Sequence, residues 1–272
     1  MPEIAEVRVV ANVLKKNILK KKIKSIEILY PNIIDGDTND FQNKLKGLSF
    51  ENISTYGKWI IFNLGEYSLL SHLRMEGKYY YLESSMPYEK HTHVIFHLDN
   101  NYDLRYNDVR KFGRMKLVKT SDIYDDSAIK KLGKEPDDKS LTKAYLKEKL
   151  KRDKRPIKDI LLDQTVINGL GNIYANEVLF CSNINPLKKG LDLNDVDIEN
   201  IIINSERIIK RSYELGGCTI RSYTSSLGVT GHYQEELKVH MREGEKCFNC
   251  NEIINKIKIN GRSTYYCPKC QK

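Results

Sequence analysis

Near its C-terminus the chain contains CFNCNEIINKIKINGRSTYYCPKC (residues 247–270), which begins and ends with a Cys-x2-Cys pair. Sixteen residues separate the two pairs, and this spacing is typical of a four-thiolate zinc ribbon. Between the pairs, Asn260-Gly261 is the preferred two-residue turn of a β-hairpin, and Arg262 follows at its tip. We predict a C-terminal zinc-ribbon β-hairpin with one structural Zn²⁺, because four cysteine ligands leave no open position for catalysis. The predicted ligands are Cys247, Cys250, Cys267 and Cys270.

The composition of the chain favours a metal site over disulfides. No run of about 18 apolar residues is present that could span a membrane, and polar residues interrupt the apolar stretch of residues 7–18, so it does not resemble a signal peptide. These features predict a cytosolic protein, in which thiols stay reduced and paired cysteines bind metal. The net charge of +9 over 272 residues favours a polyanionic partner such as nucleic acid.

The region before the ribbon shows helical periodicity from about residue 123 to residue 213. Helices are predicted at residues 141–150, 157–162, 173–181 and 198–213. The second and third are joined by Asn168-Gly169-Leu170-Gly171-Asn172, which places Asn172 in the favoured N-cap position. A helix N-terminus suits a phosphate group, but a helix-turn-helix joint without a ligand explains the same residues, and the spacing alone does not decide between them.

Two further segments in this half allow two interpretations each. A cluster of basic residues between Lys151 and Lys158 is either a solvated surface or a surface that follows the DNA backbone. The segment of residues 216–231 is rich in Gly, Ser and Thr and lacks periodicity, which suits either a functional loop or a linker.

The N-terminal half combines one amphipathic helix, from Val7 to about Lys20, with short β-type runs punctuated by turns. The sequence therefore predicts an α+β multidomain protein: an N-terminal helix plus antiparallel β-sandwich, a helical domain and the zinc ribbon. The predicted domains are residues 1–125, 126–232 and 233–272. Strands are predicted at residues 23–30, 59–64, 68–73, 78–82, 93–98, 104–106 and 115–118.

The first three residues, Met1, Pro2 and Glu3, offer a nucleophile that exists only at a chain end. Removal of Met1 would make Pro2 an N-terminal secondary amine, which can add to an aldehyde-like carbon and lose water to give an iminium. An α-amino group has a reference pKa roughly 2.5 units below that of a lysine side chain, so more of it is unprotonated near neutral pH. Glu3 is a candidate acid or base beside it. Because many chains begin in this way, the motif alone is weak.

Taken together, three motifs resemble the formamidopyrimidine-DNA glycosylase/endonuclease VIII family of bifunctional base-excision repair enzymes. They are MPEIAEV at residues 1–7, GLGNIYA at residues 169–175, which resembles the helix-two-turn-helix motif of the family, and GRSTYYCPKCQ at residues 261–271. The resemblance implies that a damaged base is flipped out of duplex DNA, that the Pro2 nitrogen attacks the sugar C1′ as a Schiff-base nucleophile, and that Glu3 handles protons. Elimination on the 3′ and then the 5′ side leaves a one-nucleotide gap.

The resemblance also implies roles for residues outside the N-terminus. Lys58 and Arg262 match cations that contact the phosphates flanking the lesion and act in the eliminations, and Asn172 matches an asparagine at the same phosphates. Met75, Arg110 and Phe112 match residues that fill the gap left by the flipped base. Further matches are His91 and Lys154 at DNA-contacting positions and Glu6 at an acidic position that supports the site.

The Met75, Arg110 and Phe112 set favours the branch that acts on 8-oxoguanine and formamidopyrimidines, and residues after Gly216 match its lesion-recognition loop. Ala5 and Arg8 depart from the family pattern without removing a catalytic group. The implied partner is damaged double-stranded DNA in the bacterial cytoplasm, at the nucleoid. The sequence itself gives no sign of self-association or of membrane association, so we expect a monomer. Two alternatives are an endonuclease VIII-type enzyme that prefers oxidised pyrimidines and a zinc-ribbon protein that recognises damage without cutting it.

Overall fold

The computed structural model describes residues 1–218 and 230–272, which form two compact units. The first unit is Met1–Lys130 together with the described part of Gly216–Gly231, and the second is Lys131–Leu215 together with His232–Lys272. Most of the predicted lesion-recognition loop lies outside the described residues. The division into domains at residues 125 and 232 stays a prediction.

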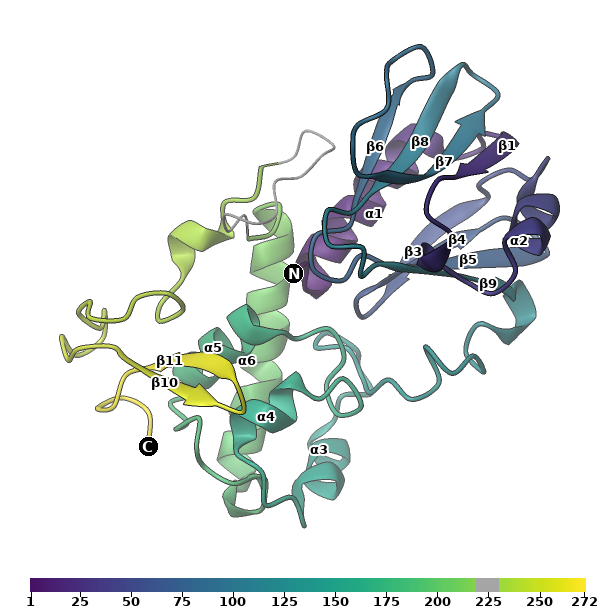
Figure 1. The fold of residues 1–272 in the computed structure, drawn as a ribbon. Helices are drawn as coiled ribbons and strands as arrows, with labels where there is room; N and C mark the ends of the chain where they lie inside the picture. Colours follow the sequence, from purple (N-terminus) through teal and green to yellow (C-terminus); the bar gives the residue numbers. More distant parts are fainter. Residues whose placement is uncertain (219–229) are drawn as a thin grey trace. The chain divides into compact units, whose positions relative to one another are not determined.

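The first unit contains helix α1 (Ile4–Ile18), helix α2 (Thr38–Leu45) and two β-sheets (Figure 1). Its strands are β1 (Ile23–Ile28), β2 (Ile34–Asp35), β3 (Asn52–Tyr56), β4 (Trp59–Asn63), β5 (Tyr67–His72), β6 (Lys78–Glu83), β7 (Thr92–Leu98), β8 (Tyr102–Asn107) and β9 (Arg114–Lys119). One sheet has the order β1-β7-β8-β6 and the other β2-β9-β5-β4-β3. The pairings among these strands are antiparallel, apart from the short parallel pairing of β2 with β9.

The two sheets and α1 share one apolar core, which confirms the predicted sandwich. The rings of Phe62 on β4 and Tyr79 on β6 meet edge to face across the two sheets, 5.5 Å apart. On α1, the predicted apolar face is buried from Val7 to Ile18. The helix begins at Ile4, three residues earlier than predicted, so Pro2 and Glu3 lead directly into its first turn.

The second unit contains four α-helices and one hairpin (Figure 1). They are α3 (Lys143–Leu150), α4 (Ile157–Leu162), α5 (Asn172–Cys181), α6 (Asp195–Glu214), β10 (Asn255–Ile259) and β11 (Arg262–Tyr266). The helices confirm the predicted ranges within a few residues. The N-cap prediction for Asn172 was wrong: Gly171, with extended backbone angles, is the N-cap, and Asn172 is the first helical residue.

The C-terminal hairpin pairs Asn255 with Tyr266 through to Ile259 with Arg262. Asn260 and Gly261 form its turn with φ values of 43° and 77°, the left-handed angles that a two-residue hairpin turn requires. A small apolar core, which includes Val239, Ile254 and Phe180 of α5, packs around two of the cysteines. The ribbon therefore folds against α5.

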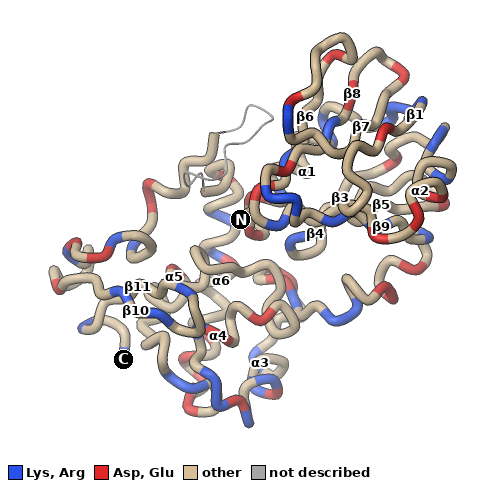
Figure 2. The backbone as a smooth tube through the Cα atoms, in the orientation of Figure 1, with Lys and Arg blue, Asp and Glu red and all other residues tan. Residues whose placement is uncertain are grey.

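Among the described residues, no helix is both long enough and apolar enough to cross a membrane. Lys and Arg occur along both units, with Asp and Glu interspersed among them (Figure 2). The positive charge is therefore not confined to one segment, and the predicted DNA contacts have to be assessed from local geometry.

Candidate active site and DNA-binding residues

The N-terminal residues are buried at the start of α1. Glu3 is 2% exposed and Glu6 is 6% exposed, and the Glu6 carboxylate accepts a hydrogen bond of 2.8 Å from the Glu3 backbone N–H. This contact closes the first turn of the helix, where free N–H groups otherwise lack partners. Pro2 and Glu3 are therefore held in one geometry by the helix that follows them.

Charged groups surround the terminal amine of this unit. The pKa of the Met1 ammonium is lowered, mainly by burial. The nearby carboxylates of Glu3, Glu6 and Glu76 oppose this shift, and the positive charge of Lys58 adds to it. A lowered pKa leaves more of an amine unprotonated and nucleophilic at neutral pH.

Lys58 is placed by a tight turn between β3 and β4. Tyr56 pairs with Trp59, so Gly57 and Lys58 form a two-residue turn in which Gly57 has a φ of 56°. Lys58 is only 6% exposed, unlike most lysines at hairpin turns. Because Lys58 is buried and affects the pKa of the terminal amine, its ammonium group belongs to the same site as Glu3 and Glu6.

His72 is a neighbour of Lys58 that the sequence alone did not single out as a site residue. It pairs with Trp59 across the sheet, and its Nδ1 accepts a hydrogen bond of 3.0 Å from the Arg74 N–H. Burial, with smaller effects from Arg74 and Lys58, lowers the pKa of His72 to about 3. The ring is therefore neutral at physiological pH and carries its proton on Nε2, as a hydrogen-bond donor without charge.

Glu6 also connects the N-terminus to the start of the predicted recognition loop. Its second carboxylate oxygen accepts a hydrogen bond of 2.8 Å from the Cys218 backbone N–H. The preceding Gly217 has a φ of 86°, and a Cβ there would lie 3.0 Å from the Glu6 carboxylate. One carboxylate thus bridges the helix that carries Glu3 and the last described residues before the loop.

The predicted gap-filling residues come from two loops that meet at one hydroxyl group. Met75 lies in the loop that ends at Gly77, and Phe112 lies in the loop that ends at Gly113. A Cβ on Gly77 would lie 2.3 Å from the Tyr106 hydroxyl oxygen, and one on Gly113 would lie 1.7 Å from it. Both glycines are required because the buried Tyr106 side chain occupies the space between the loops.

Asp108 shapes the second of these loops. Its carboxylate accepts hydrogen bonds from the backbone N–H groups of Arg110, at 3.0 Å, and Gly113, at 2.8 Å. The loop then projects Phe112, which is 50% exposed, with the Arg110 guanidinium 4.9 Å from the centre of its ring. An exposed phenylalanine beside an arginine is suited to contact with unpaired bases.

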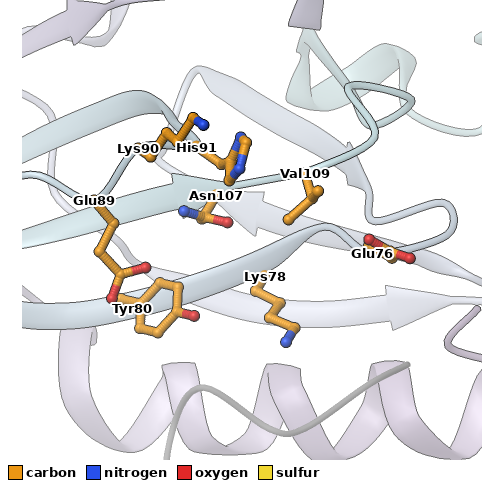
Figure 3. Close-up of a pocket in the computed structure, with 8 residues that line it drawn as sticks. All are labelled: Glu76, Lys78, Tyr80, Glu89, Lys90, His91, Asn107 and Val109. Carbon is orange, nitrogen blue, oxygen red and sulfur yellow. The ribbon is translucent and has the colours of Figure 1, made fainter. Parts of the chain in front are cut away.

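His91 lines a cavity of about 250 Å³ in the first unit (Figure 3). Its other walls include Lys78 and Lys90 as well as Glu76, the residue after Met75. Asn107, at the end of β8, lies beside His91 in the same wall (Figure 3). The predicted DNA contact His91 therefore shares a cavity with the loop that carries Met75.

In the second unit, Asn172 and the hairpin that carries Arg262 are directly connected. The Asn172 Nδ2 donates a hydrogen bond of 2.9 Å to the backbone carbonyl of Ser263, the residue after Arg262. Arg262 itself is exposed. The two predicted phosphate contacts of this unit therefore lie close to one another.

The basic cluster of residues 151–158 does not act as one surface. Lys154 is exposed. Arg155 is paired with Asp153, at 2.7 Å, and Asp163, at 2.9 Å. Lys158 is fully buried, so neither interpretation of the cluster applies to it, whereas Arg155 is exposed and ion-paired.

The four predicted zinc ligands form one cluster. Their Sγ atoms all lie within 4.8 Å of one another, with Cys247 and Cys270 at 3.9 Å and Cys250 and Cys267 at 3.4 Å. A tetrahedral site with Zn–S bonds of about 2.3 Å requires sulfur atoms roughly 3.8 Å apart. The cluster therefore fits one zinc ion bound by four thiolates.

Three family models match consecutive parts of the chain. The formamidopyrimidine-DNA glycosylase N-terminal domain matches residues 1–115, the formamidopyrimidine-DNA glycosylase H2TH domain matches residues 132–224, and a zinc finger found in FPG and IleRS matches residues 244–272. A formamidopyrimidine-DNA glycosylase of Oceanobacillus iheyensis is 41% identical over 273 residues, which cover 100% of this chain and 98% of the relative.

Solved structures match over the same length. A Lactococcus lactis FPG variant in complex with a Fapy-dG-containing DNA is 40% identical, with a TM-score of 0.95 over 100% of both chains. The wild-type Lactococcus lactis protein in complex with an oxidized pyrimidine-containing DNA is 39% identical, with a TM-score of 0.93, again over 100% of both chains.

Proposed function

The chain belongs to the formamidopyrimidine-DNA glycosylase family, and from this premise we infer that it removes oxidised purines from duplex DNA and then cleaves the abasic site. The observation that carries this inference is the N-terminal group of residues, in which Pro2 is buried together with Glu3, Glu6 and Lys58. A protein that only recognised damage would not need such a group. The alternative of a zinc-ribbon protein without activity is therefore not favoured.

The proposed nucleophile is the secondary amine of Pro2 after removal of Met1. Its nitrogen attacks C1′ of the flipped nucleotide and the bond to the base breaks, while Glu3 gives a proton to the opening sugar ring. The resulting iminium withdraws electrons from C2′, so that loss of a C2′ proton expels the 3′ phosphate. A second elimination then expels the 5′ phosphate.

The proposed phosphate contacts are Lys58 in the first unit and Asn172 and Arg262 in the second. A fixed cation stabilises the negative charge of a leaving phosphate without reorganisation. Lys154 and His91 would bind the DNA backbone further along. Met75, Arg110 and Phe112 would occupy the gap in the stack, and Glu6 would hold Glu3 and the start of the recognition loop.

The ribbon binds one structural zinc ion, which fixes the hairpin and takes no part in the chemistry. The substrate is damaged double-stranded DNA, bound by a monomer. The bacterial relatives favour action in the cytoplasm, on the DNA of the nucleoid.

The lesion range is tested by comparing cleavage of matched duplexes that contain 8-oxoguanine opposite cytosine or an oxidised pyrimidine. We expect single-turnover cleavage of the 8-oxoguanine duplex to be at least about tenfold faster, a difference of roughly 1.4 kcal/mol in the activation free energy. Cleavage rates are measured because affinity for the damaged duplex alone does not distinguish the 8-oxoguanine branch of the family from the endonuclease VIII-type branch. Faster cleavage of the pyrimidine duplex would favour the endonuclease VIII-type alternative.

Arg262→Ala should weaken binding to an abasic-analogue duplex and reduce the slope of log Kd against log salt concentration by about one counterion. The reason is the loss of one phosphate contact. Lys258→Ala is a matched control, because it removes one exposed positive charge from the same hairpin without an assigned phosphate contact. If the two variants show the same salt slope, the assignment of Arg262 is wrong.

A further inference from the structure

Three buried polar residues of the second unit form a chain of contacts that the proposed mechanism does not use. They are Lys158 on α4, Asn176 on α5 and His240 in the segment that precedes the ribbon, and their exposed fractions are 0%, 1% and 7%. Burying an ammonium group and two other polar side chains is costly unless each is hydrogen-bonded. Their contacts therefore indicate why such residues are tolerated there.

Lys158 contacts two successive turns of α5. Its Nζ donates one hydrogen bond of 3.0 Å to the backbone carbonyl of Asn172 and another of 2.5 Å to the Oδ1 of Asn176. Asn172 is the first residue of α5 and a proposed phosphate contact. The ammonium thus fixes the end of the helix that carries Asn172.

The contact with Lys158 also fixes the direction of the Asn176 amide. Because its oxygen accepts from Lys158, its NH₂ group faces His240 Nδ1 at 2.8 Å. An amide nitrogen can only donate, so His240 Nδ1 is the acceptor and carries no proton. Burial and Lys158 lower the pKa of His240 to about 4, in agreement with a neutral ring.

His240 extends the chain to the hairpin. Its ring lies edge-on to that of Tyr265 on β11, with centroids 5.2 Å apart, three residues from Arg262. The backbone around His240 is fixed by Glu177, the next residue on α5, whose carboxylate accepts from the His240 N–H at 2.8 Å. Two sets of contacts therefore join the start of α5 to the hairpin. One is the series of contacts from Lys158 through Asn176 and His240 to Tyr265. The other is the hydrogen bond from Asn172 to Ser263.

We propose that Asn176 is a positioning residue for DNA binding: it joins Lys158 to His240 and so fixes Asn172 relative to the hairpin that presents Arg262. The proposal rests on the proposed function, in which Asn172 and Arg262 bind the phosphates beside the lesion. Asn176 itself does not contact the DNA. Replacing Asn176 is expected to change DNA affinity by displacing Arg262.

The test is a double-mutant cycle between Asn176→Leu and Arg262→Ala, with Kd measured on a duplex that contains a tetrahydrofuran abasic-site analogue. Leucine has a similar size and removes both hydrogen bonds. Asn176→Leu should weaken binding about tenfold in the parent protein but less than about twofold when Arg262 is already alanine, as expected for coupled residues. Zinc content and thermal unfolding are measured for each variant.

Asn176→Asp is the conservative control. A carboxylate can accept from Lys158, and it can also accept from His240 once the neutral ring moves its proton to Nδ1. This variant should bind within about threefold of the parent. If Asn176→Asp lost as much DNA affinity as Asn176→Leu, the proposal would be overturned, because the hydrogen bonds of residue 176 would then not explain the effect on affinity.

His240→Phe provides a second route to the same result if Asn176→Leu does not fold. It keeps a ring against Tyr265 and removes the acceptor for Asn176, so its effect should also shrink in the Arg262→Ala background. Equal losses in both backgrounds would overturn the positioning role and leave the function intact. If Arg262→Ala alone changes neither Kd nor salt slope, the assigned phosphate contact fails, and the positioning role fails with it.

Discussion

Protein that retains Met1 should bind an 8-oxoguanine:cytosine duplex but give no covalent adduct with it on borohydride reduction. With Met1 in place, the Pro2 nitrogen is part of a peptide bond, and resonance with the carbonyl removes its nucleophilic lone pair. The Met1 amine is one residue away, about 3.8 Å along the chain. A displacement of even about 1 Å from the reactive geometry can lower a rate about a hundredfold.

The experiment compares three preparations whose N-termini are established by intact mass: processed protein, protein that retains Met1, and processed Pro2→Gly. Processed protein should be trapped, and the adduct should map to residue 2. Pro2→Gly still presents an amine at residue 2 and should be trapped more slowly. Duplex binding without trapping separates a chemical defect from a folding defect.

Equal trapping with and without Met1 would contradict the assignment of Pro2. In that case the Met1 amine or a lysine would be the nucleophile in the form that retains Met1; the mapped position of the adduct would tell them apart, and the buried Lys58 would be the first lysine to replace. The reference pKa of an α-amine lies below that of a lysine side chain, so more of the N-terminal amine is unprotonated near neutral pH, which favours it over a lysine as the nucleophile.

The sequence predicted those elements whose own residues show a clear period or turn. The six residues of α4 match the prediction, and the Asn260-Gly261 turn follows from two residues with left-handed angles. Helix α2 was missed because only Phe41 and Leu45 of its eight residues are buried, too few to show helical periodicity. The start of α1 was predicted too late because the first residues were interpreted as a site and not as the beginning of a helix. In the structure the Glu6 side chain closes the first turn, directly after those residues.

The supporting residues of the site could not be predicted, because their roles depend on contacts between distant segments. In the sequence Tyr106 is the last residue of a predicted strand and shows no other signal. In the structure its hydroxyl group occupies the space between the loops that end at Gly77 and Gly113. His72 becomes a neighbour of Lys58 through the register of β4 and β5. Lys158 belongs to a basic cluster in the sequence but is buried against α5.

Cys247→Ser should abolish stoichiometric zinc binding and unfold the C-terminal ribbon. Zinc ligation supplies about 10–16 kcal/mol to the folding of small zinc-binding peptides, and the apolar core around Cys247 and Cys267 is small. Loss of one ligand leaves three thiols, of which Cys267 is buried and Cys250 and Cys270 are half-buried, without the ion that holds them together. We therefore expect less than about one tenth of the zinc content of the parent at equal chelator concentration.

The same variant should lose DNA affinity, because the ribbon presents Arg262 and fixes Asn172 through Ser263. Loss of charge-assisted contacts of about 1.5–3 kcal/mol predicts binding that is roughly ten- to a hundredfold weaker. Cys181→Ser is the matched control: this half-buried cysteine lies on α5 outside the metal cluster and should keep both zinc and affinity. A Cys247→Ser protein with one bound zinc and unchanged Kd would show that the hairpin folds without the four-thiolate site, and that Arg262 is positioned by the contacts with α5 alone.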